Sequence, residues 1–500
     1  MDPHMDPDRN TEMDTERERA IVESVRNGLY IDGEWQAATG GGTFDVEDPS
    51  TEETLCRVAD ATAEDAVAAL NAACAAQDEW ARTPPRDRGE ILRRAFEMIM
   101  ARREDLALLM TLEMGKPLVE SRAEITYAAE FFRWFAEEAV RVAGRYSIAP
   151  TGDSRLLTMK QPVGPCLLIT PWNFPLAMGA RKIGPAIAAG CTMVMKPAQA
   201  TPLSTLALTE ILAEAGLPPG VLNVIPSSSA SRVTAPLLRD PRLRKLSFTG
   251  STEVGRKLMA QASSNLLRLS LELGGNAPFL VFADADLEAA VHGALIAKLR
   301  NMGQSCVAAN RFYVEEPIAE AFTDLLADKM AALKVDRGTE EGTDVGPLVS
   351  AEQRAKVVEL VEDAVAKGAK VMAGGRIPQI TGYFYQPTVL SEVPDNARLL
   401  REEVFGPVAP IRAFKTEEQA IAEANDTEYG LVAYVYTRDI ERALRVTEAL
   451  RTGMVGLNRG LVSNPAGPFG GVKQSGFGRE GGSEGIEEYL DIKYVSIEAP

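Results

Sequence analysis

Histidine is almost absent from this chain of 500 residues, which contains only His4 and His292. A nucleophile in this protein therefore has no obvious imidazole to serve as its general base. Cysteine is also scarce: there are five cysteines, an odd number, and none forms a Cys-x-x-Cys pair. This usage favours a reducing compartment, the cytoplasm, over a disulfide framework, and we expect no bound metal.

Positive charge and long apolar runs are lacking as well. The formal net charge of −18 argues against binding to nucleic acid or to an anionic membrane surface. The longest apolar stretch, 183–195, is interrupted by Gly184, Pro185 and Gly190, so we expect no membrane span. Residues 1–25 are highly charged and are expected to form a disordered or frayed tail.

The order of the sequence patterns predicts an α/β protein. A chain of this length exceeds what one core normally organises, so two or three domains are expected. Helical patterns dominate 60–143, and strands then alternate with helices over 163–273, including a strand at 245–249 and a helix at 252–262. The alternation resumes after Gly275. Such alternation is typical of mostly parallel sheets covered by helices.

One cysteine has a setting that suggests chemistry. Cys306 ends the loop Arg300–Cys306, which contains Gly303, and Glu272 lies in an earlier Leu-Glu-Leu-Gly-Gly segment. A thiolate adds readily to a carbonyl carbon, and a buried carboxylate can take protons or activate water. The other four cysteines have small or apolar neighbours and are interpreted as packing residues.

Two further segments match ligand-binding turns. Asn173 lies between Pro171 and Pro175 after a predicted strand, where its carboxamide could stabilise an oxyanion. The segment Gly250–Gly255 follows a strand and opens a helix, a place suited to a phosphate. Either segment taken alone also fits a purely structural turn.

Taken together and in order, these motifs resemble the aldehyde dehydrogenase superfamily over about 29–497. The matching positions are Asn173, Lys196, Phe248–Thr252, Glu272–Gly275, Gly303–Cys306 and Glu403–Pro407. The resemblance implies a Rossmann-like cofactor domain (26–141 and 161–273) and an α/β catalytic domain (274–483). It also implies a small β bridging or oligomerisation element (142–160 and 484–500) and a homodimer or homotetramer.

The resemblance implies NAD(P)-dependent oxidation of an aldehyde to a carboxylic acid. Cys306 would attack the aldehyde to give a thiohemiacetal and then a thioester, and Asn173 would hold the oxyanion. Glu272 would activate the water that releases the acid. The cationic cofactor ring and Lys196 would favour the thiolate. The implied cofactor contacts are Trp172, Lys196, Gln199, Gly250, Ser251, Leu273, Glu403 and Phe405.

Arg181, Arg300 and Ser463 look like the set that grips the substrate's distal carboxylate in the succinate-semialdehyde dehydrogenase branch. The implied reaction converts succinate semialdehyde to succinate. Glutarate semialdehyde, 2-oxoglutarate semialdehyde or an uncharged aldehyde remain alternatives, as does a non-catalytic binding protein on this scaffold. Gln199 stands where NAD-preferring relatives commonly carry glutamate, so NADP is favoured over NAD because no carboxylate would repel its 2′-phosphate.

Overall fold

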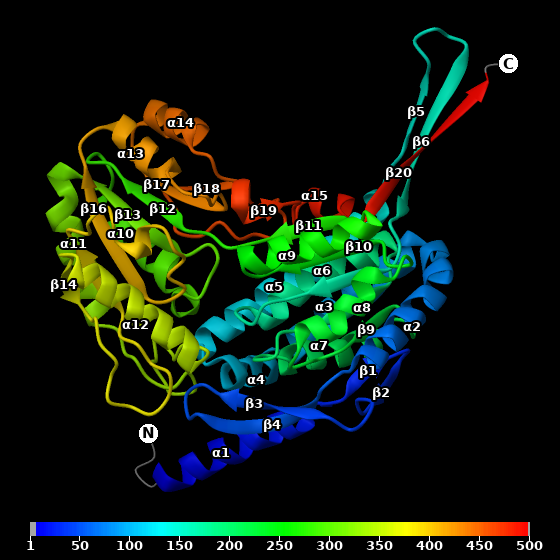
Figure 1. Cartoon of the computed structure of the whole chain (residues 1–500), viewed down its shortest axis with the longest axis horizontal. Coiled ribbons are helices and arrows are strands. Elements are labelled where there is room, and N and C mark those ends of the chain that lie inside the picture. The colour runs from blue at the N-terminus through cyan, green and yellow to red at the C-terminus, as the bar shows by residue number, and fades with distance from the viewer. Residues whose placement is uncertain (1–6, 499–500) are drawn as a thin grey trace.

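The protein consists of two lobes and a projecting arm (Figure 1). A computed structural model describes residues 7–498, with side chains from residue 15 onward. Within this range the strands form sheets of eight, seven, three and two members. The mixture of parallel sheets and covering helices confirms the predicted α/β class.

The eight-stranded sheet forms the centre of the first lobe. Its strand order is β19-β11-β10-β7-β8-β9-β1-β2. The parallel part comprises β7 (Cys166–Ile169), β8 (Met193–Lys196), β9 (Leu222–Val224), β10 (Lys245–Thr249) and β11 (Arg268–Glu272). The antiparallel edges are β1 (Leu29–Ile31), β2 (Glu34–Gln36) and β19 (Gly476–Phe477). β19 lies within 274–483, the range expected for the catalytic domain, but it pairs with the sheet of the first lobe.

Helices cover both faces of this sheet. Because successive strand residues point to opposite faces, Cys166 and Leu168 enter one core and Leu167 and Ile169 the other. The first core contains α3 (Pro85–Ala101), α4 (Arg103–Met114), α5 (Leu118–Glu138), α6 (Pro175–Ala189) and α7 (Leu203–Glu214). The second contains most of α2 (Ala63–Arg82), with α8 (Ala230–Arg239) and α9 (Thr252–Ala262).

The second lobe is built on the seven-stranded sheet. Its order is β14 (Lys370–Ala373), β15 (Thr388–Ser391), β16 (Val408–Phe414), β13 (Ala309–Glu315), β12 (Ala277–Val281), β17 (Val432–Tyr436) and β18 (Met454–Leu457), parallel except for β14. Its helices are α10 (Leu287–Leu299), α11 (Glu316–Ala331), α12 (Ala351–Ala366), α13 (Glu417–Asn425) and α14 (Ile440–Ala449).

The arm is the three-stranded sheet of β5 (Arg145–Ile148), β6 (Ser154–Pro162) and β20 (Leu490–Glu498). It projects away from both lobes (Figure 1), and β6 pairs antiparallel with β20 along its whole length. The short helix α15 (Glu484–Glu487) precedes β20, and Ile486 packs in the first lobe's core rather than on the arm. A separate hairpin, β3 (Thr43–Asp48) with β4 (Glu53–Ala59), completes the sheets.

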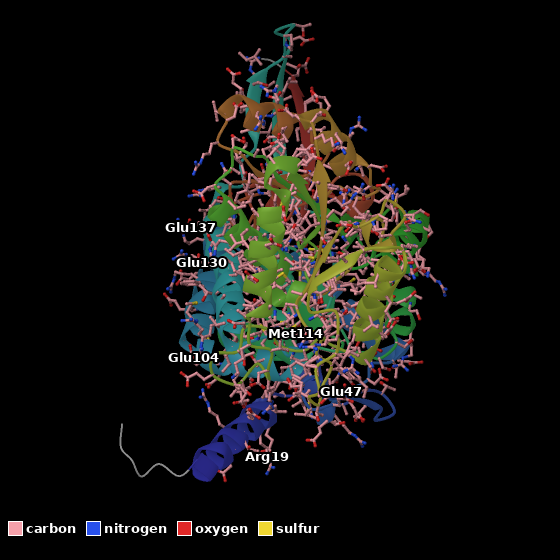
Figure 2. The ribbon with its side chains drawn as sticks, turned by 90° about the vertical axis from the view of Figure 1, so that its left-hand side faces the viewer. Arg19, Glu47, Glu104, Met114, Glu130 and Glu137 are labelled. Carbon is pink, nitrogen blue, oxygen red and sulfur yellow. The ribbon has the colours of Figure 1, made fainter. Side chains whose placement is uncertain are left out.

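The expected N-terminal tail is a helix where the structure describes it. Residues 1–6 lie outside the described residues, but α1 (Pro7–Ser24) is helical and lies at the end of the molecule opposite the arm (Figure 2). Ile21, Val22 and Val25 pack against the first lobe's core. The prediction of a frayed tail over 7–24 was wrong because these few apolar side chains find a surface to cover, which the charged composition concealed.

Candidate active site

Most of the predicted catalytic and cofactor residues line one cavity of about 240 Å³. It lies where the parallel strands of the first sheet end, the edge at which ligands bind in open α/β sheets. Its lining includes Trp172, Asn173, Gly250, Ser251, Glu272, Leu273, Cys306, Glu403 and Phe405. The cavity therefore joins loops of the first lobe to the loops of the second lobe that carry Cys306 and Glu403.

Asn173 is fixed from several sides. It lies between β7 and α6 and is buried, and its carboxamide Nδ2 donates to the backbone oxygen of Gln304 at 3.0 Å. Its own backbone oxygen accepts hydrogen bonds from Lys116 Nζ at 3.0 Å and Asn301 Nδ2 at 2.8 Å. Because an amide nitrogen carries two hydrogens, Nδ2 keeps one for an oxygen in the cavity.

Glu272 carries the free carboxylate of the site. It ends β11 and is 2% exposed, and neither carboxylate oxygen has a hydrogen-bond partner among the described residues. Burial first, and then the charge of Glu480, raise the pKa of Glu272 well above its usual value, while Arg181 opposes the shift. A carboxylate in this state is suited to accept a proton from water near neutral pH.

Cys306 follows α10 in the second lobe and is partly exposed. Burial of the thiol raises its pKa to about 12, and the negative charges of Glu403 and Glu272 act in the same direction. The cation that lowers this pKa is Arg181 rather than Lys196, which the sequence had suggested. The protein alone therefore keeps Cys306 as a thiol near neutral pH.

The remaining cavity residues fit a dinucleotide. Glu403 accepts a hydrogen bond from the N–H of Gly275 at 3.1 Å, and burial raises its pKa to about 7. Phe405 lies edge-on to Trp172, with ring centroids 5.4 Å apart. The buried hydroxyl of Thr249 has no hydrogen-bond partner among the described residues and lies beside the N-terminus of α9. This terminus is suited to a phosphate.

Two predicted cofactor residues lie outside this lining. Lys196 ends β8 and is buried, and burial lowers its pKa to about 8. Gln199 follows in an exposed turn. Both lie at the same carboxyl edge of the first sheet as the cavity, beyond the residues that enclose it.

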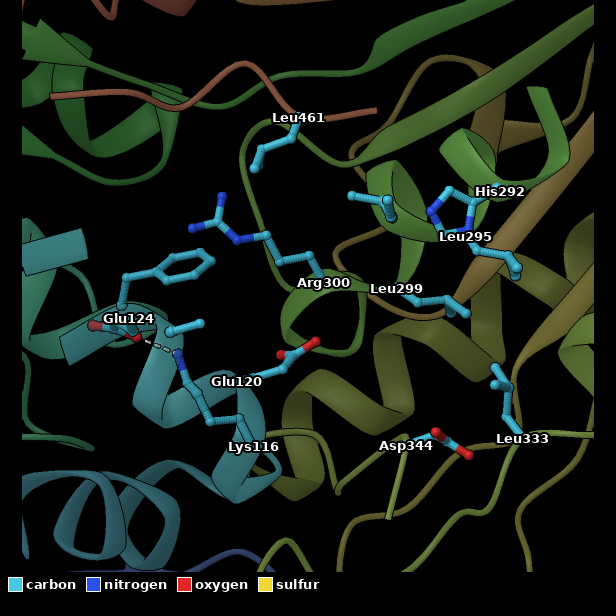
Figure 3. Close-up of a pocket in the computed structure, with 13 residues that line it drawn as sticks. Lys116, Glu120, Glu124, His292, Leu295, Leu299, Arg300, Leu333, Asp344 and Leu461 are labelled. Carbon is cyan, nitrogen blue, oxygen red and sulfur yellow. Dashed lines mark hydrogen bonds and ion pairs between the residues drawn. The ribbon is translucent and has the colours of Figure 1, made fainter. Parts of the chain in front are cut away.

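Arg300 and Ser463 lie together. Arg300 Nη1 donates to Ser463 Oγ at 3.3 Å, and its guanidinium stacks over Phe174 at 4.9 Å and Tyr127 at 5.6 Å. Arg300 lines a second cavity of about 400 Å³ (Figure 3). In the described part of the chain it forms no ion pair with a carboxylate.

Arg181 differs from Arg300 because its guanidinium already has a carboxylate partner within the protein. It lies on α6, is 2% exposed, and pairs with Glu480 at 2.7 Å while stacking over Phe469 at 3.9 Å. Lys182 pairs with the same carboxylate at 2.6 Å. Arg181 Nε is buried without a hydrogen-bond partner among the described residues, and Arg181 is not among the residues that line either cavity.

A sequence model described as the aldehyde dehydrogenase family matches residues 35–495. The chain belongs to this family. The match covers both lobes and the strands of the arm, and it agrees with the cavity that holds Cys306, Glu272 and Asn173. The chain is therefore an NAD(P)-dependent aldehyde dehydrogenase.

Similar members of the family act on related compounds. A succinate-semialdehyde dehydrogenase of Paenarthrobacter nicotinovorans is 60% identical over 89% of this chain and 99% of its own. A glutarate-semialdehyde dehydrogenase of Pseudomonas putida is 52% identical over 94% and 98%. The crystal structure of an E. coli NADP-dependent enzyme superposes with a TM-score of 0.94 at 50% identity, covering 95% of this chain and 98% of that one.

This aldehyde dehydrogenase also contains site residues that the sequence interpretation missed. Lys116, Glu120 and Glu124 line the second cavity, and Glu480 binds Arg181. The spacing of four residues between Glu120 and Glu124 was a usable signal, since such positions share one face of α5, whereas Lys116 precedes this helix and has no such signal. Glu480 has no such signal because its partners come from a distant part of the sequence.

Two further findings concern the described residues as a whole. None of the helices between residues 7 and 498 is long and apolar enough to cross a membrane. Among the side chains that the structure describes, from residue 15 to 498, no group of three or more His, Cys, Asp or Glu is arranged to hold a metal ion.

Proposed function

We propose that this enzyme oxidises succinate semialdehyde to succinate, with NADP preferred over NAD as the acceptor. The observation that carries the substrate proposal is Arg300, which lines the second cavity beside Ser463 and whose guanidinium forms no ion pair with a carboxylate among the described residues. Guanidinium groups bind carboxylates through paired hydrogen bonds. The names of the similar enzymes, which act on succinate and glutarate semialdehydes, support an aldehyde with a distal carboxylate.

In this mechanism the Cys306 thiol loses its proton to solvent through Glu272, and the thiolate adds to the aldehyde carbon while Asn173 Nδ2 and the Cys306 backbone N–H stabilise the oxyanion. The nicotinamide cofactor, when bound, supplies the hydride acceptor. Glu272 then takes a proton from the water that attacks the thioester, which releases the acid and restores the thiol. Arg300 and Ser463, together with Arg181, are proposed to orient the distal carboxylate.

The cofactor would be held by the cavity residues described above, with Glu403 and Lys196 on ribose hydroxyls, Phe405 beside the nicotinamide ribose, and Gly250 and Ser251 near the phosphates. Gln199, which is exposed, presents no charge to a 2′-phosphate. We expect Gln199→Glu to raise the KM for NADP at least tenfold and to leave the KM for NAD within a few-fold, because a carboxylate there repels only the extra phosphate. Initial rates with each cofactor measure this, and an unchanged NADP/NAD ratio would contradict it.

The assembly is proposed to be a homodimer or homotetramer that works in the cytoplasm. The arm exposes Tyr146, Ile148, Ile492 and Tyr494, and its outer strands β5 and β20 have unpaired edges in a single chain. Apolar side chains and open strand edges of this kind are normally covered by a partner. The five free cysteines agree with a reducing compartment.

The proposal is tested by supplying purified protein with succinate semialdehyde and either cofactor. Growth of the reduced-nicotinamide absorbance is expected, and Cys306→Ala should abolish it without changing the melting temperature much. Glutarate semialdehyde, 2-oxoglutarate semialdehyde and an uncharged aldehyde of similar length serve as competitors. If kcat/KM is higher for glutarate semialdehyde than for succinate semialdehyde, glutarate semialdehyde is the preferred substrate. If the uncharged aldehyde reacts as fast as succinate semialdehyde, Arg300 does not select the substrate. No turnover of any aldehyde would favour a binding protein instead.

A further inference from the structure

The turn that precedes the nucleophile has an unusual backbone. Asn301 and Met302 are buried, and their φ angles of 57° and 55° lie in the left-handed region that residues other than glycine rarely adopt. Such a conformation persists only where neighbouring groups hold it. The groups that contact this turn are therefore candidates for a role in placing Cys306.

Glu120 provides one of these contacts. Its Oε2 accepts a hydrogen bond from the backbone N–H of Asn301 at 2.6 Å, a short bond strengthened by the charge of the carboxylate. Glu120 lies on the first turn of α5, and Figure 3 shows its carboxylate between Lys116 and Arg300. The contact links the first lobe directly to the loop of the nucleophile.

The side chain of Asn301 continues this link to the oxyanion site. Asn301 Nδ2 donates to the backbone oxygens of Asn173 at 2.8 Å and Gln304 at 2.9 Å. The carboxamide of Asn173 donates to the same oxygen of Gln304. The buried side chain of Asn301 thus joins Asn173, which supplies the carboxamide of the oxyanion site, to the loop that carries the Cys306 N–H.

We propose that Glu120 is a positioning residue for the oxyanion site, acting through the backbone N–H of Asn301. The proposal rests on the role of Asn173 and Cys306 in the proposed function. When the Glu120 carboxylate holds the left-handed turn, Asn301 keeps the two donors of the oxyanion site, Asn173 Nδ2 and the Cys306 N–H, in their positions relative to each other. A displacement of about 1 Å in such a site is enough to slow a reaction by about 100-fold.

Three variants test this role. Glu120→Ala removes the acceptor and is expected to lower kcat about 10- to 100-fold for carboxylated and uncharged aldehydes alike, with KM for the cofactor unchanged. Glu120→Gln keeps a carbonyl acceptor for the Asn301 N–H and should recover most of that loss. In an Asn173→Ala background, Glu120→Ala should cost little more, because both changes damage the same oxyanion site.

The control is Glu137→Ala, an exposed residue of the same helix, which should leave kcat as in the wild type. If Glu120→Ala does not fold, Glu120→Asp, whose carboxylate is one methylene shorter, takes its place in the cycle. The proposal is overturned if Glu120→Gln is as slow as Glu120→Ala. It is also overturned if kcat of the double variant falls by the product of the two single losses, because the two residues would then act independently. If Asn173→Ala has no effect, the oxyanion role in the proposed function fails, whereas a slow Asn173→Ala variant beside a fully active Glu120→Ala variant overturns the role of Glu120 alone.

Discussion

Cys306 and Glu272 share a cavity in which burial raises the pKa of each. Both groups are therefore held in their neutral forms more strongly than in water, although the proposed reaction needs each in its ionised form at some step. Arg181 is the nearby cation that opposes both shifts, and Glu480 partly neutralises it. Burial is the largest cause of both shifts, and the balance between Arg181 and Glu480 adjusts the pKa values within it.

This balance predicts the effect of Glu480→Gln. The substitution removes a negative charge that raises the pKa of Glu272, so that pKa falls and the base is ionised at lower pH. We expect the rising limb of the kcat–pH profile to move to lower pH, together with a lower melting temperature because Lys182 loses its buried partner. Glu137→Gln is the matched control. A limb that stays in place, or that moves to higher pH, would contradict this origin of the pKa shift.

Arg300 predicts a split between substrates. Arg300→Ala removes the unpaired guanidinium and should raise KM for succinate semialdehyde about 30- to 100-fold, equivalent to about 2–3 kcal/mol. KM for an uncharged aldehyde of similar length should change only a few-fold. Steady-state kinetics on both substrates measure the difference, with Arg122→Ala, an exposed arginine of α5, as the control. Equal losses on both substrates would mean that Arg300 shapes the cavity instead of binding the carboxylate.

At the scale of elements, the sequence patterns located most strands and helices of the parallel sheets. The strand at 245–249 and the helix at 252–262 coincide with β10 and α9, because a buried strand and an amphipathic helix each leave a local period. α1 was missed because its charged composition hides Ile21 and Val22, the apolar residues of this helix that pack. The pairing of β19 with β11 was missed because two residues leave no period.

The arm is the element whose stability depends most on a partner. Tyr494 on β20 is 58% exposed, and the neighbouring Ile492 is 67% exposed. We expect Tyr494→Asp to shift the particle to a lower mass in size-exclusion chromatography with light scattering, because burying a carboxylate in an apolar contact is costly. Val365→Asp, at a 41% exposed site of α12, which lies far from the arm (Figure 1), should leave the mass unchanged. An unchanged mass for Tyr494→Asp would place the interface elsewhere.

At the scale of the whole molecule, one arginine connects distant parts of the chain. Arg337, in a loop of the second lobe, pairs with Glu18 of α1 at 2.9 Å and with the buried Asp48 of β3 at 3.0 Å. The same loop lies against Gly115 and Lys116, where a side chain at Gly338 or Gly346 would collide with their backbone oxygens. These contacts hold the N-terminal segment and the first lobe against the second.

Arg337→Ala should therefore destabilise the protein more than the loss of a surface ion pair. It leaves Asp48, which is 3% exposed on its side chain, without its cation, and we expect the free energy of unfolding to fall by about 2 kcal/mol. Arg57→Ala, which breaks an exposed pair with Asp45, should cost at most about 1 kcal/mol. Urea unfolding of both variants gives the comparison, and equal costs would show that Arg337 is not a structural link.

The sequence by itself determined the class of fold and the kinds of groups that could react. Strand and helix periods are local, and the motifs around Asn173, Glu272 and Cys306 lie in short segments, so both can be recognised without coordinates. Only the tertiary structure decided how these groups are charged and held. It pairs Arg181 with Glu480, leaves Arg300 unpaired, and fixes Asn301 through Glu120. Burial and charge pairing depend on residues that are distant in the chain, and no local pattern encodes those distances.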